Sequence, residues 1–387
     1  MTKIIPDIAV KFPSKFQNDF PNTMQYFGFF TKEEIENNKD KLLMLDIDFG
    51  RYCSLSCPAC FRKSNLVDDI PEGDLTYDEL IKIIDEAKVL GLKMIKICGA
   101  GEPTQNSRFL PFIEAMTKKD IGVAVFTKGQ VLGSDEQAKK FNQQYGINSA
   151  KELCQRLAKL KVSFMLSFQS FEVEKQDELV GGIKGHALIR NQALVNLVEA
   201  GFNNSEPTRL CLELGPITKK NYEEVFAIYT YARRRNIYLI TNLLMTSGKQ
   251  IDSDFLAEYD FSPEAKIDLF TKIYSWNIEN GLQTLDQIKE EGISCMPGIH
   301  PCNQVACGLY ITAKGNAVGC PGFGELEDIE GNIRKEDIKT IWEKSRNKKL
   351  YVGKFNCLCP PKDGITIPYG LYAEVLKRLE KRYNNKH

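Results

Sequence analysis

Three cysteines within eight residues are the most reactive feature of this sequence. Cys53, Cys57 and Cys60 lie in the stretch LDIDFGRYCSLSCPACFR (45–62), directly after an apolar run that has the pattern of a buried strand. Thiolates bind soft metals and iron–sulfur clusters, so the C-x3-C-x2-C spacing predicts three ligands on one tight loop. A closed zinc site needs a fourth ligand, and none of the three histidines is near in sequence. A three-cysteine cluster would keep one iron open; a chance group of thiols or half of a zinc site are the alternatives.

The chain has 12 cysteines, and half of them form a second group near the C-terminus. Two such groups, in a chain without a secretory signal, indicate metal or iron–sulfur ligation rather than disulfides. Cys98, Cys154 and Cys211 stand alone and are expected to be small core residues. The C-terminal group consists of Cys295, Cys302, Cys307, Cys320, Cys357 and Cys359.

The composition excludes several classes of partner. Lys+Arg and Asp+Glu both number 51 in 387 residues, so the formal net charge is zero and no nucleic-acid partner is expected. No apolar run reaches about 18 residues, which argues against a membrane span. The N-terminus lacks an apolar signal core and a cleavage site, so we expect a mature cytoplasmic protein.

Short apolar runs alternate with helical patterns between residues 43 and 248. This alternation predicts a parallel sheet covered by helices, as an α/β (β/α)6 partial TIM barrel or a doubly wound sheet. In either architecture the chemistry lies at the carboxyl ends of the strands, which is where the three-cysteine loop begins. The expected strands are 42–49, 93–100, 121–128, 161–168, 208–214 and 237–245.

The remaining segments differ in character from this repeat. Residues 1–42 form an N-terminal extension, and 249–295 read as a linker that contains a long helix. Residues 296–387 are expected to be a small α+β domain, in which CGLYITAKGNAVGC predicts a hairpin around a Lys-Gly-Asn turn. The repeat at 43–248 is the barrel domain.

The CxxxCxxC motif after the first strand of a βα repeat resembles the signature of the radical S-adenosylmethionine (SAM) superfamily. The resemblance implies that Cys53, Cys57 and Cys60 hold a [4Fe–4S] cluster whose open iron binds SAM. One electron would then split SAM into methionine and a 5′-deoxyadenosyl radical, which abstracts hydrogen from the substrate. The reductant would be a partner such as flavodoxin or ferredoxin.

Further SAM-binding residues follow from the same resemblance. CGAGEPT (98–104) is similar to the family's GGEP element, which implies contacts of Gly99, Gly101 and Glu102 with the methionine amino group. Glycines at these positions let the backbone approach a ligand closely. The segment after the fourth strand resembles the ribose-contacting region and implies roles for Ser167 and Gln169.

Three other residues belong to the implied SAM pocket. Glu213 and Asn242, at the fifth and sixth strands, are candidates for contacts with adenine and methionine. The residue before the third cysteine is usually aromatic in the family and packs on adenine, whereas here it is Ala59. Phe61, directly after the third cysteine, is expected to take that role.

The C-terminal cysteines resemble the SPASM/twitch extension of radical SAM enzymes, which holds auxiliary iron–sulfur clusters. Too few cysteines match for two clusters, so one auxiliary [4Fe–4S] cluster is expected; a zinc ribbon-like site is the alternative. Cys295 is either a hydrogen donor to a substrate radical or a plain linker thiol. The preferred ligands are Cys302, Cys307, Cys320 and Cys357, with Cys359 as the substitute.

The resemblance implies an oxidoreductase or modifying enzyme and leaves its substrate open. One class is a small metabolite, such as an aminosugar or cofactor precursor, and the other is a peptide that a ribosomal peptide maturase cross-links. The auxiliary cluster would assist an oxidation or a bond-forming step. A non-catalytic iron–sulfur or zinc scaffold that binds partners is the third possibility, and the GAGEPT element (99–104) argues against it.

Overall fold

The computed structural model describes residues 2–17, 20–61, 73–247, 250, 252–323 and 329–384. Its framework is one sheet with the strand order β6-β5-β4-β3-β2-β1-β7-β8-β9. Strands β1 to β7 run parallel, while β8 and β9 are antiparallel to their neighbours. The strands span Met44–Ile47 (β1), Met94–Ile97 (β2), Gly122–Thr127 (β3), Val162–Ser167 (β4), Leu210–Glu213 (β5), Tyr238–Ile240 (β6), Gly308–Ile311 (β7), Asn316–Val318 (β8) and Ile329–Asn332 (β9).

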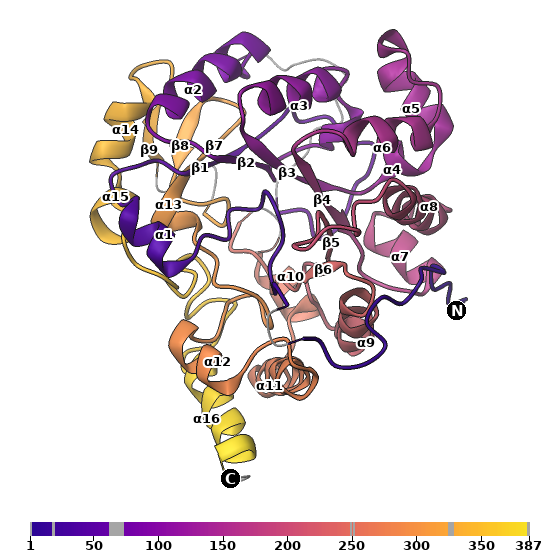
Figure 1. Cartoon of the computed structure of the whole chain (residues 1–387), viewed down its shortest axis with the longest axis vertical. Helices are drawn as coiled ribbons and strands as arrows, with labels where there is room; N and C mark the ends of the chain where they lie inside the picture. The colour runs from indigo at the N-terminus through magenta and orange to yellow at the C-terminus, as the bar shows by residue number, and fades with distance from the viewer. Residues whose placement is uncertain are drawn as a thin grey trace.

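Helices surround the outside of the curved parallel part of this sheet (Figure 1). The described helices are α1 (Lys32–Asn37), α2 (Tyr77–Val89), η1 (Pro103–Gln105), α3 (Phe109–Lys118), α4 (Gln130–Gly133), α5 (Asp135–Asn142), η2 (Gln143–Tyr145), α6 (Ala150–Leu157), α7 (Val173–Leu179), α8 (His186–Glu199), α9 (Tyr222–Arg233), α10 (Ser253–Tyr259), α11 (Pro263–Asn280), α12 (Leu285–Glu291), α13 (Gln304–Cys307), α14 (Ile338–Lys344), α15 (Arg346–Leu350) and α16 (Leu371–Tyr383). None of them combines the length and apolar character that a membrane span needs.

The α/β fold class and the six strands expected from the apolar runs are confirmed. Each of β1 to β6 lies inside its predicted run, and the fold is a partial barrel rather than a doubly wound sheet. The strands are shorter than the runs because the apolar residues continue into buried loops. Residues 248 and 249, where the predicted barrel ends and the linker begins, lie outside the described residues.

The predicted C-terminal hairpin forms from β7 and β8, and it extends the barrel sheet beyond β1. Met44 pairs with Gly308, and Ile47 pairs with Ile311, in a parallel ladder. Gly308 permits this close pairing, because a Cβ atom there would lie 2.2 Å from the Met44 carbonyl oxygen. The strand that precedes the three-cysteine loop is therefore flanked by a barrel strand and by a strand of the cysteine-rich C-terminal segment.

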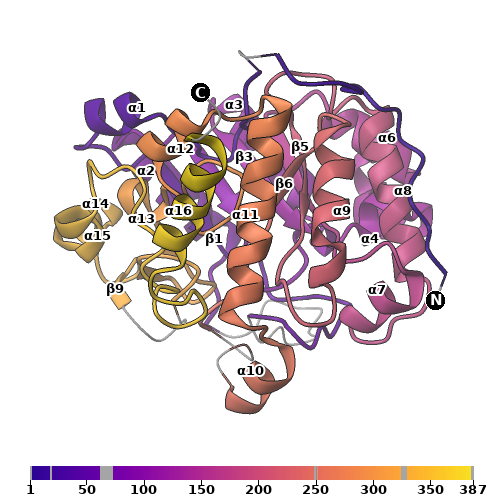
Figure 2. The same ribbon diagram turned by 90° about the horizontal axis from the view of Figure 1, so that it is seen from below.

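The C-terminal helix fixes the loop that carries the last two cysteines. Figure 2 shows α16 lying alongside α11, with Leu371, Val375 and Leu379 of α16 buried. Arg378 of α16 donates hydrogen bonds to acidic residues of α11. The Tyr372 hydroxyl donates to the Leu358 carbonyl oxygen at 3.1 Å, which ties the Cys-Leu-Cys turn to this helix.

Asp48, just beyond the end of β1, connects the three neighbouring strand ends. Its Oδ1 accepts hydrogen bonds from the Ala100 N–H at 2.7 Å and from the Tyr310 hydroxyl at 2.6 Å. Its Oδ2 accepts from the Ala313 N–H at 2.8 Å. The carboxylate is buried, so these contacts from the β2 loop and the β7 hairpin satisfy a charge that would be costly to leave unpaired.

Replacing Asp48 with alanine should strongly destabilise the fold. The substitution leaves the buried Ala100 and Ala313 N–H groups and the Tyr310 hydroxyl without their acceptor. Each unsatisfied group costs about 1–3 kcal/mol. We expect a clear decrease in the urea midpoint of unfolding. Tyr310→Phe is the matched control, because it removes one of the three contacts and should lower stability by about 1 kcal/mol. An Asp48→Ala protein that unfolds at the wild-type midpoint would contradict the assigned role.

Candidate active site

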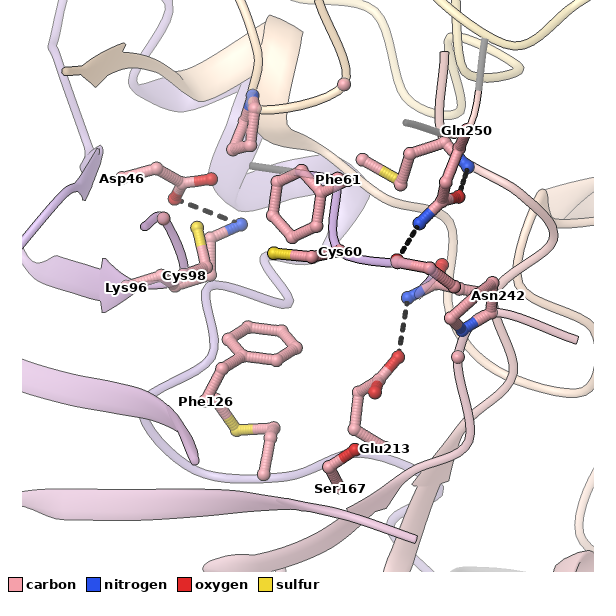
Figure 3. Close-up of a pocket in the computed structure, with 18 of the residues that line it drawn as sticks. Asp46, Cys60, Phe61, Lys96, Cys98, Phe126, Ser167, Glu213, Asn242 and Gln250 are labelled. Atoms are coloured by element: carbon pink, nitrogen blue, oxygen red, sulfur yellow. Dashed lines mark hydrogen bonds and ion pairs between the residues drawn. The ribbon is translucent and has the colours of Figure 1, made fainter. Parts of the chain in front are cut away.

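A cavity of about 260 Å³ lies at the carboxyl ends of the barrel strands. Its walls come from the loops after β1 to β6 and from the C-terminal cysteine-rich segment, and Figure 3 shows part of the lining. Cys307 and Cys357, both predicted cluster ligands, are absent from the lining. The predicted residues that do line it are Cys53, Cys57, Cys60, Phe61, Gly99, Gly101, Glu102, Ser167, Gln169, Glu213, Asn242, Cys295, Cys302, Cys320 and Cys359.

The loop after β1 places its three thiols on this cavity. The Cys60 N–H donates to the Cys57 carbonyl oxygen at 3.1 Å, which closes a tight turn between two of the cysteines. Two glutamines hold the loop from outside: Gln105 Oε1 accepts from the Ser54 N–H, and Gln250 Nε2 donates to the Ala59 carbonyl oxygen. Both contacts fix the backbone that carries the thiols.

Burial favours the protonated thiol at two of these cysteines, Cys53 and Cys57. It raises the pKa of Cys53 to about 12 and also raises the pKa of Cys57. Binding of iron would therefore displace protons from sulfur. Among the described residues, no three histidine, cysteine or carboxylate side chains converge as ligands of one metal ion would. Three soft sulfur donors that line one cavity are of the type that holds an iron–sulfur cluster.

The two glycines of the β2 loop let that loop pack against the three-cysteine loop. A Cβ atom on Gly99 would lie 1.3 Å from Asp48 Oδ1. Gly101 has φ +80°, and a Cβ atom there would lie 2.6 Å from the Gly50 carbonyl oxygen. The contact of these glycines with SAM stays a prediction; in the structure they allow a close approach between two loops of the protein, and both line the cavity.

Glu102 is anchored by groups from its own loop and from the end of β3. Its Oε1 accepts from the Thr104 and Thr127 hydroxyls, both at 2.6 Å, and its Oε2 accepts from the Lys128 N–H at 2.7 Å. The carboxylate is 3% exposed and still lines the cavity. This network presents a fixed negative charge beside the cysteines, which suits a cationic ligand group such as an ammonium.

Lys128 supplies a positive charge that the sequence pattern did not predict. Its Nζ donates to Ser167 Oγ at 2.7 Å, on the cavity wall. Burial favours the neutral amine, but nearby Cys57 and Glu213 reverse this effect, and the pKa of Lys128 is raised overall. The signal in the sequence was FTKG (126–129) after the third strand, where lysine replaces the asparagine of the family's TNG.

Three predicted residues at the ends of β4, β5 and β6 are paired within the protein. Gln169 Nε2 donates to the Gly215 carbonyl oxygen at 2.9 Å, and its Oε1 accepts from Gln176 at 3.1 Å. Asn242 Nδ2 donates to Glu213 Oε1 at 3.3 Å, as Figure 3 shows. Burial raises the pKa of Glu213. These pairs shape the wall opposite β1 and β2.

Four of the six C-terminal cysteines, Cys295, Cys302, Cys320 and Cys359, line the cavity, while Cys307 and Cys357 do not. Cys302 affects the pKa of Cys307, Cys320 and Cys357, in each case after burial as the larger cause, so it lies within electrostatic range of all three. Cys307 and Cys357 belong to a small apolar cluster that includes Phe30. Cys302 therefore lines the cavity and is also within electrostatic range of the two cysteines in this apolar side-chain cluster.

Two local features of this group are typical of metal-ligating sulfur. The Gly322 N–H donates to Cys320 Sγ at 3.3 Å, a hydrogen bond that favours the thiolate. In the Cys-Leu-Cys turn, Asn356, Leu358 and Cys359 all have positive φ, between 56° and 63°. Such strained backbone persists only where the surroundings enforce it and is concentrated at functional sites. Cys295 hydrogen-bonds with Cys359, on the cavity side.

Comparison with known proteins agrees with this geometry. Residues 47–261, more than half of the chain, match the Radical SAM superfamily. The chain belongs to the radical SAM superfamily. It is 39% identical over 320 residues to the tungsten-containing aldehyde ferredoxin oxidoreductase cofactor-modifying protein of Pyrococcus furiosus, across 78% of this chain and 81% of that relative. Membership implies a modifying enzyme with a [4Fe–4S] cluster and SAM as cofactors.

Solved structures share the fold of this radical SAM enzyme at low sequence identity. Native anSMEcpe with bound AdoMet has a TM-score of 0.59 at 14% identity, over 89% of this chain and 98% of that one. Streptococcus suis SuiB bound to the precursor peptide SuiA has a TM-score of 0.55 at 16% identity, over 80% and 67% of the two chains. At these identities the likeness supports the fold alone.

Gly101→Ala should disrupt the packing of the two loops that line the cavity. The new methyl group would meet the Gly50 carbonyl oxygen in addition to the strain of a positive φ. We expect a lower melting temperature and reduced iron content after reconstitution. Gly146→Ala is the matched control, since Gly146 has φ +78° but no atom within 4 Å of a Cβ. Equal iron content in the two variants would show that the loop contact is not required for cluster binding.

Proposed function

We propose that this radical SAM enzyme cleaves SAM reductively at Cys53, Cys57 and Cys60 and uses the resulting radical on a substrate in the same cavity. When bound, the cluster supplies one electron to SAM, which gives methionine and a 5′-deoxyadenosyl radical that abstracts hydrogen from the substrate. The observation that supports this best is that the three thiols, the fixed Glu102 carboxylate and the Lys128 ammonium line one cavity.

The protein's own groups bind and orient SAM in this proposal. Glu102 and the backbone near Gly99 and Gly101 would receive the methionine ammonium, since the carboxylate is held rigidly beside the cysteines. Lys128, held by Ser167, offsets the negative charge of three thiolates. Phe61 would pack on adenine, and Gln169 shapes the ribose region through its bond to Gly215.

The C-terminal cysteines would hold one auxiliary [4Fe–4S] cluster that assists an oxidation or a bond-forming step. Cys302, Cys307, Cys320 and Cys357 remain the proposed ligands, with Cys359 as the substitute. The electrostatic coupling of Cys302 with Cys307, Cys320 and Cys357 and the N–H donor to Cys320 support this set. The coupling of Cys302 and Cys320 with Cys359 supports the substitute. Cys295 is proposed as a hydrogen donor, because it lines the cavity beside Cys359.

A small molecule is the favoured substrate class, such as a cofactor precursor or an aminosugar. The relative with 39% identity is named a cofactor-modifying protein, which favours this class. The alternative is a ribosomal peptide, because SuiB, which shares the fold, was solved with its precursor peptide. A cytoplasmic location and an electron-donating partner such as flavodoxin or ferredoxin complete the proposal. The domain division at 42, 248 and 295 is proposed with it.

Cluster-loaded protein should convert SAM to 5′-deoxyadenosine when supplied with reductant under anaerobic conditions. Cys53→Ala should abolish this product, because two remaining thiolates cannot hold the cluster with its open iron. Chromatography of the products measures the outcome. Cys154→Ala is the control, since Cys154 is a buried cysteine of α6 that does not line the cavity. A fully loaded wild-type protein that yields no 5′-deoxyadenosine would refute the proposed reaction.

Cys320→Ala should lower the iron content by about one cluster, or about four iron atoms per chain. The remaining cluster should keep the electron paramagnetic resonance signal that changes when SAM is added. Iron analysis and that spectrum are the measurements. If iron content stays at the wild-type value, Cys320 is not a cluster ligand.

A further inference from the structure

One side of the cavity carries polar groups that the proposed SAM site does not use. In Figure 3, Asp46, Lys96 and Cys98 lie on this side, while Glu213 and Asn242 lie on the other, with Cys60 between them. Asp46 and Lys96 are paired across β1 and β2 in the barrel interior. Asp46 and Lys96 line the same cavity as the loop residues, but they lie within the strands β1 and β2.

Asp46 and Lys96 form a buried ion pair. Lys96 Nζ lies 3.2 Å from Asp46 Oδ1, and Cys98 lies beside the same carboxyl group. Phe27, from the N-terminal segment, stacks on the ammonium with its ring centre 5.0 Å away. A buried ion pair seldom repays its desolvation unless further hydrogen bonds complete it. The pair has zero net charge, so it gives no counter-charge to an ionic ligand.

Gln304 has a buried side-chain carboxamide that is unpaired within the described part of the chain. Gln304 is the first residue of α13. Its side chain is 2% exposed and lines the cavity. Neither its Nε2 nor its Oε1 has a hydrogen-bond partner within the described part of the chain. Leaving a buried donor or acceptor unpaired costs about 1–3 kcal/mol each. A carboxamide with both atoms unpaired therefore indicates a partner that binds there.

Gln304 and the ion pair belong to one region around Cys302. Gln304 is two positions after Cys302 in the chain, and both residues line the same cavity as Asp46 and Lys96. A carboxamide presents one donor and one acceptor side by side, and it pairs with a group that offers the complementary edge. The amide edge of a lactam or a carboxamide, with N–H next to C=O, is such a group.

We propose that Gln304, beside the Asp46–Lys96 pair, binds a neutral lactam or carboxamide edge of the substrate. The inference rests on the proposed function, because it assigns this subsite to the substrate of the same cavity. A carboxylate offers no donor to Gln304 Oε1, and an ammonium offers no acceptor to Gln304 Nε2, so either would leave one atom of the carboxamide unpaired. The substrate is then a small molecule that carries a ring or side-chain amide and presents it to the wall formed by β1, β2 and α13.

Binding of three small probes to cluster-loaded protein with excess SAM and no reductant tests this subsite. The probes are 2-pyrrolidinone, which has the amide edge, cyclopentanone, which lacks the N–H, and cyclopentanecarboxylate, which is charged. Ligand-observed NMR titration measures each dissociation constant, expected in the millimolar range for such small ligands. The lactam should bind about fivefold more tightly than either other probe, the worth of one hydrogen bond.

Gln304→Leu should remove the preference for the lactam, and Gln304→Glu should do the same because it loses the donor while keeping the shape. Gln143→Leu, at an exposed position in η2, should keep the preference. Iron content and melting temperature are checked for each variant. If Gln304→Leu does not take up its iron–sulfur clusters, the binding data for Gln304→Glu test the inference. Equal binding of the lactam and the ketone by wild type, or a preference that survives both Gln304 variants, overturns the inference.

Formation of 5′-deoxyadenosine in the same preparations separates the two proposals. Wild-type protein that cleaves SAM but shows no lactam preference refutes the subsite and leaves the proposed reaction intact. Protein that prefers the lactam but cannot cleave SAM supports the subsite and refutes the reaction.

Discussion

The buried carboxylate of Asp48 is the contact on which the geometry of the site depends. It accepts hydrogen bonds from the β2 loop and from the hairpin that begins with β7, while its own backbone leads into the three-cysteine loop. Gly99 must be glycine because this carboxylate occupies the space of its side chain. One residue therefore holds the three-cysteine loop, the β2 loop and the β7–β8 hairpin in position relative to one another.

Charge balance is the second constraint on the cavity. Cys53, Cys57 and Glu102 bring negative charge once the thiols lose their protons, and Lys128 is the cation that faces them. Asp46 and Lys96 balance each other separately. Burial raises the pKa of Asp46 to about 6, and the lysine opposes that shift. The Asp46–Lys96 pair is thus balanced separately from the charges near the three-cysteine loop.

Local patterns predicted much of this architecture. Apolar runs separated by amphipathic helices predicted the six barrel strands, and the Lys-Gly-Asn turn predicted the β7–β8 hairpin. Cysteine spacing alone singled out both groups of thiols. Such features are visible because they depend on residues that are close together in the chain.

Long-range pairings were not predictable from the same patterns. Nothing local indicates that β7 pairs with β1, or that Asp46 faces Lys96, since both depend on sheet register. Phe27 was assigned to an extension yet lines the cavity. Lys128 and Gln304 are ordinary polar residues in sequence, and only their burial beside the cavity distinguishes them. The contacts of Gly99 with Asp48 and of Gly101 with Gly50 were not predictable either, because they join two separate loops.

The pairing of β1 with β7 also determines when the site can be completed during synthesis. Asp48 and Tyr310, which hydrogen-bond to each other, are 262 positions apart in the chain. Contacts of such high sequence separation form late, because a long loop must close first. During translation β1 keeps an open edge, and open edges favour wrong pairing and aggregation. The contacts of Asp48 with Tyr310 and Ala313, which border the three-cysteine loop, can therefore form only after the β7–β8 hairpin has been synthesised.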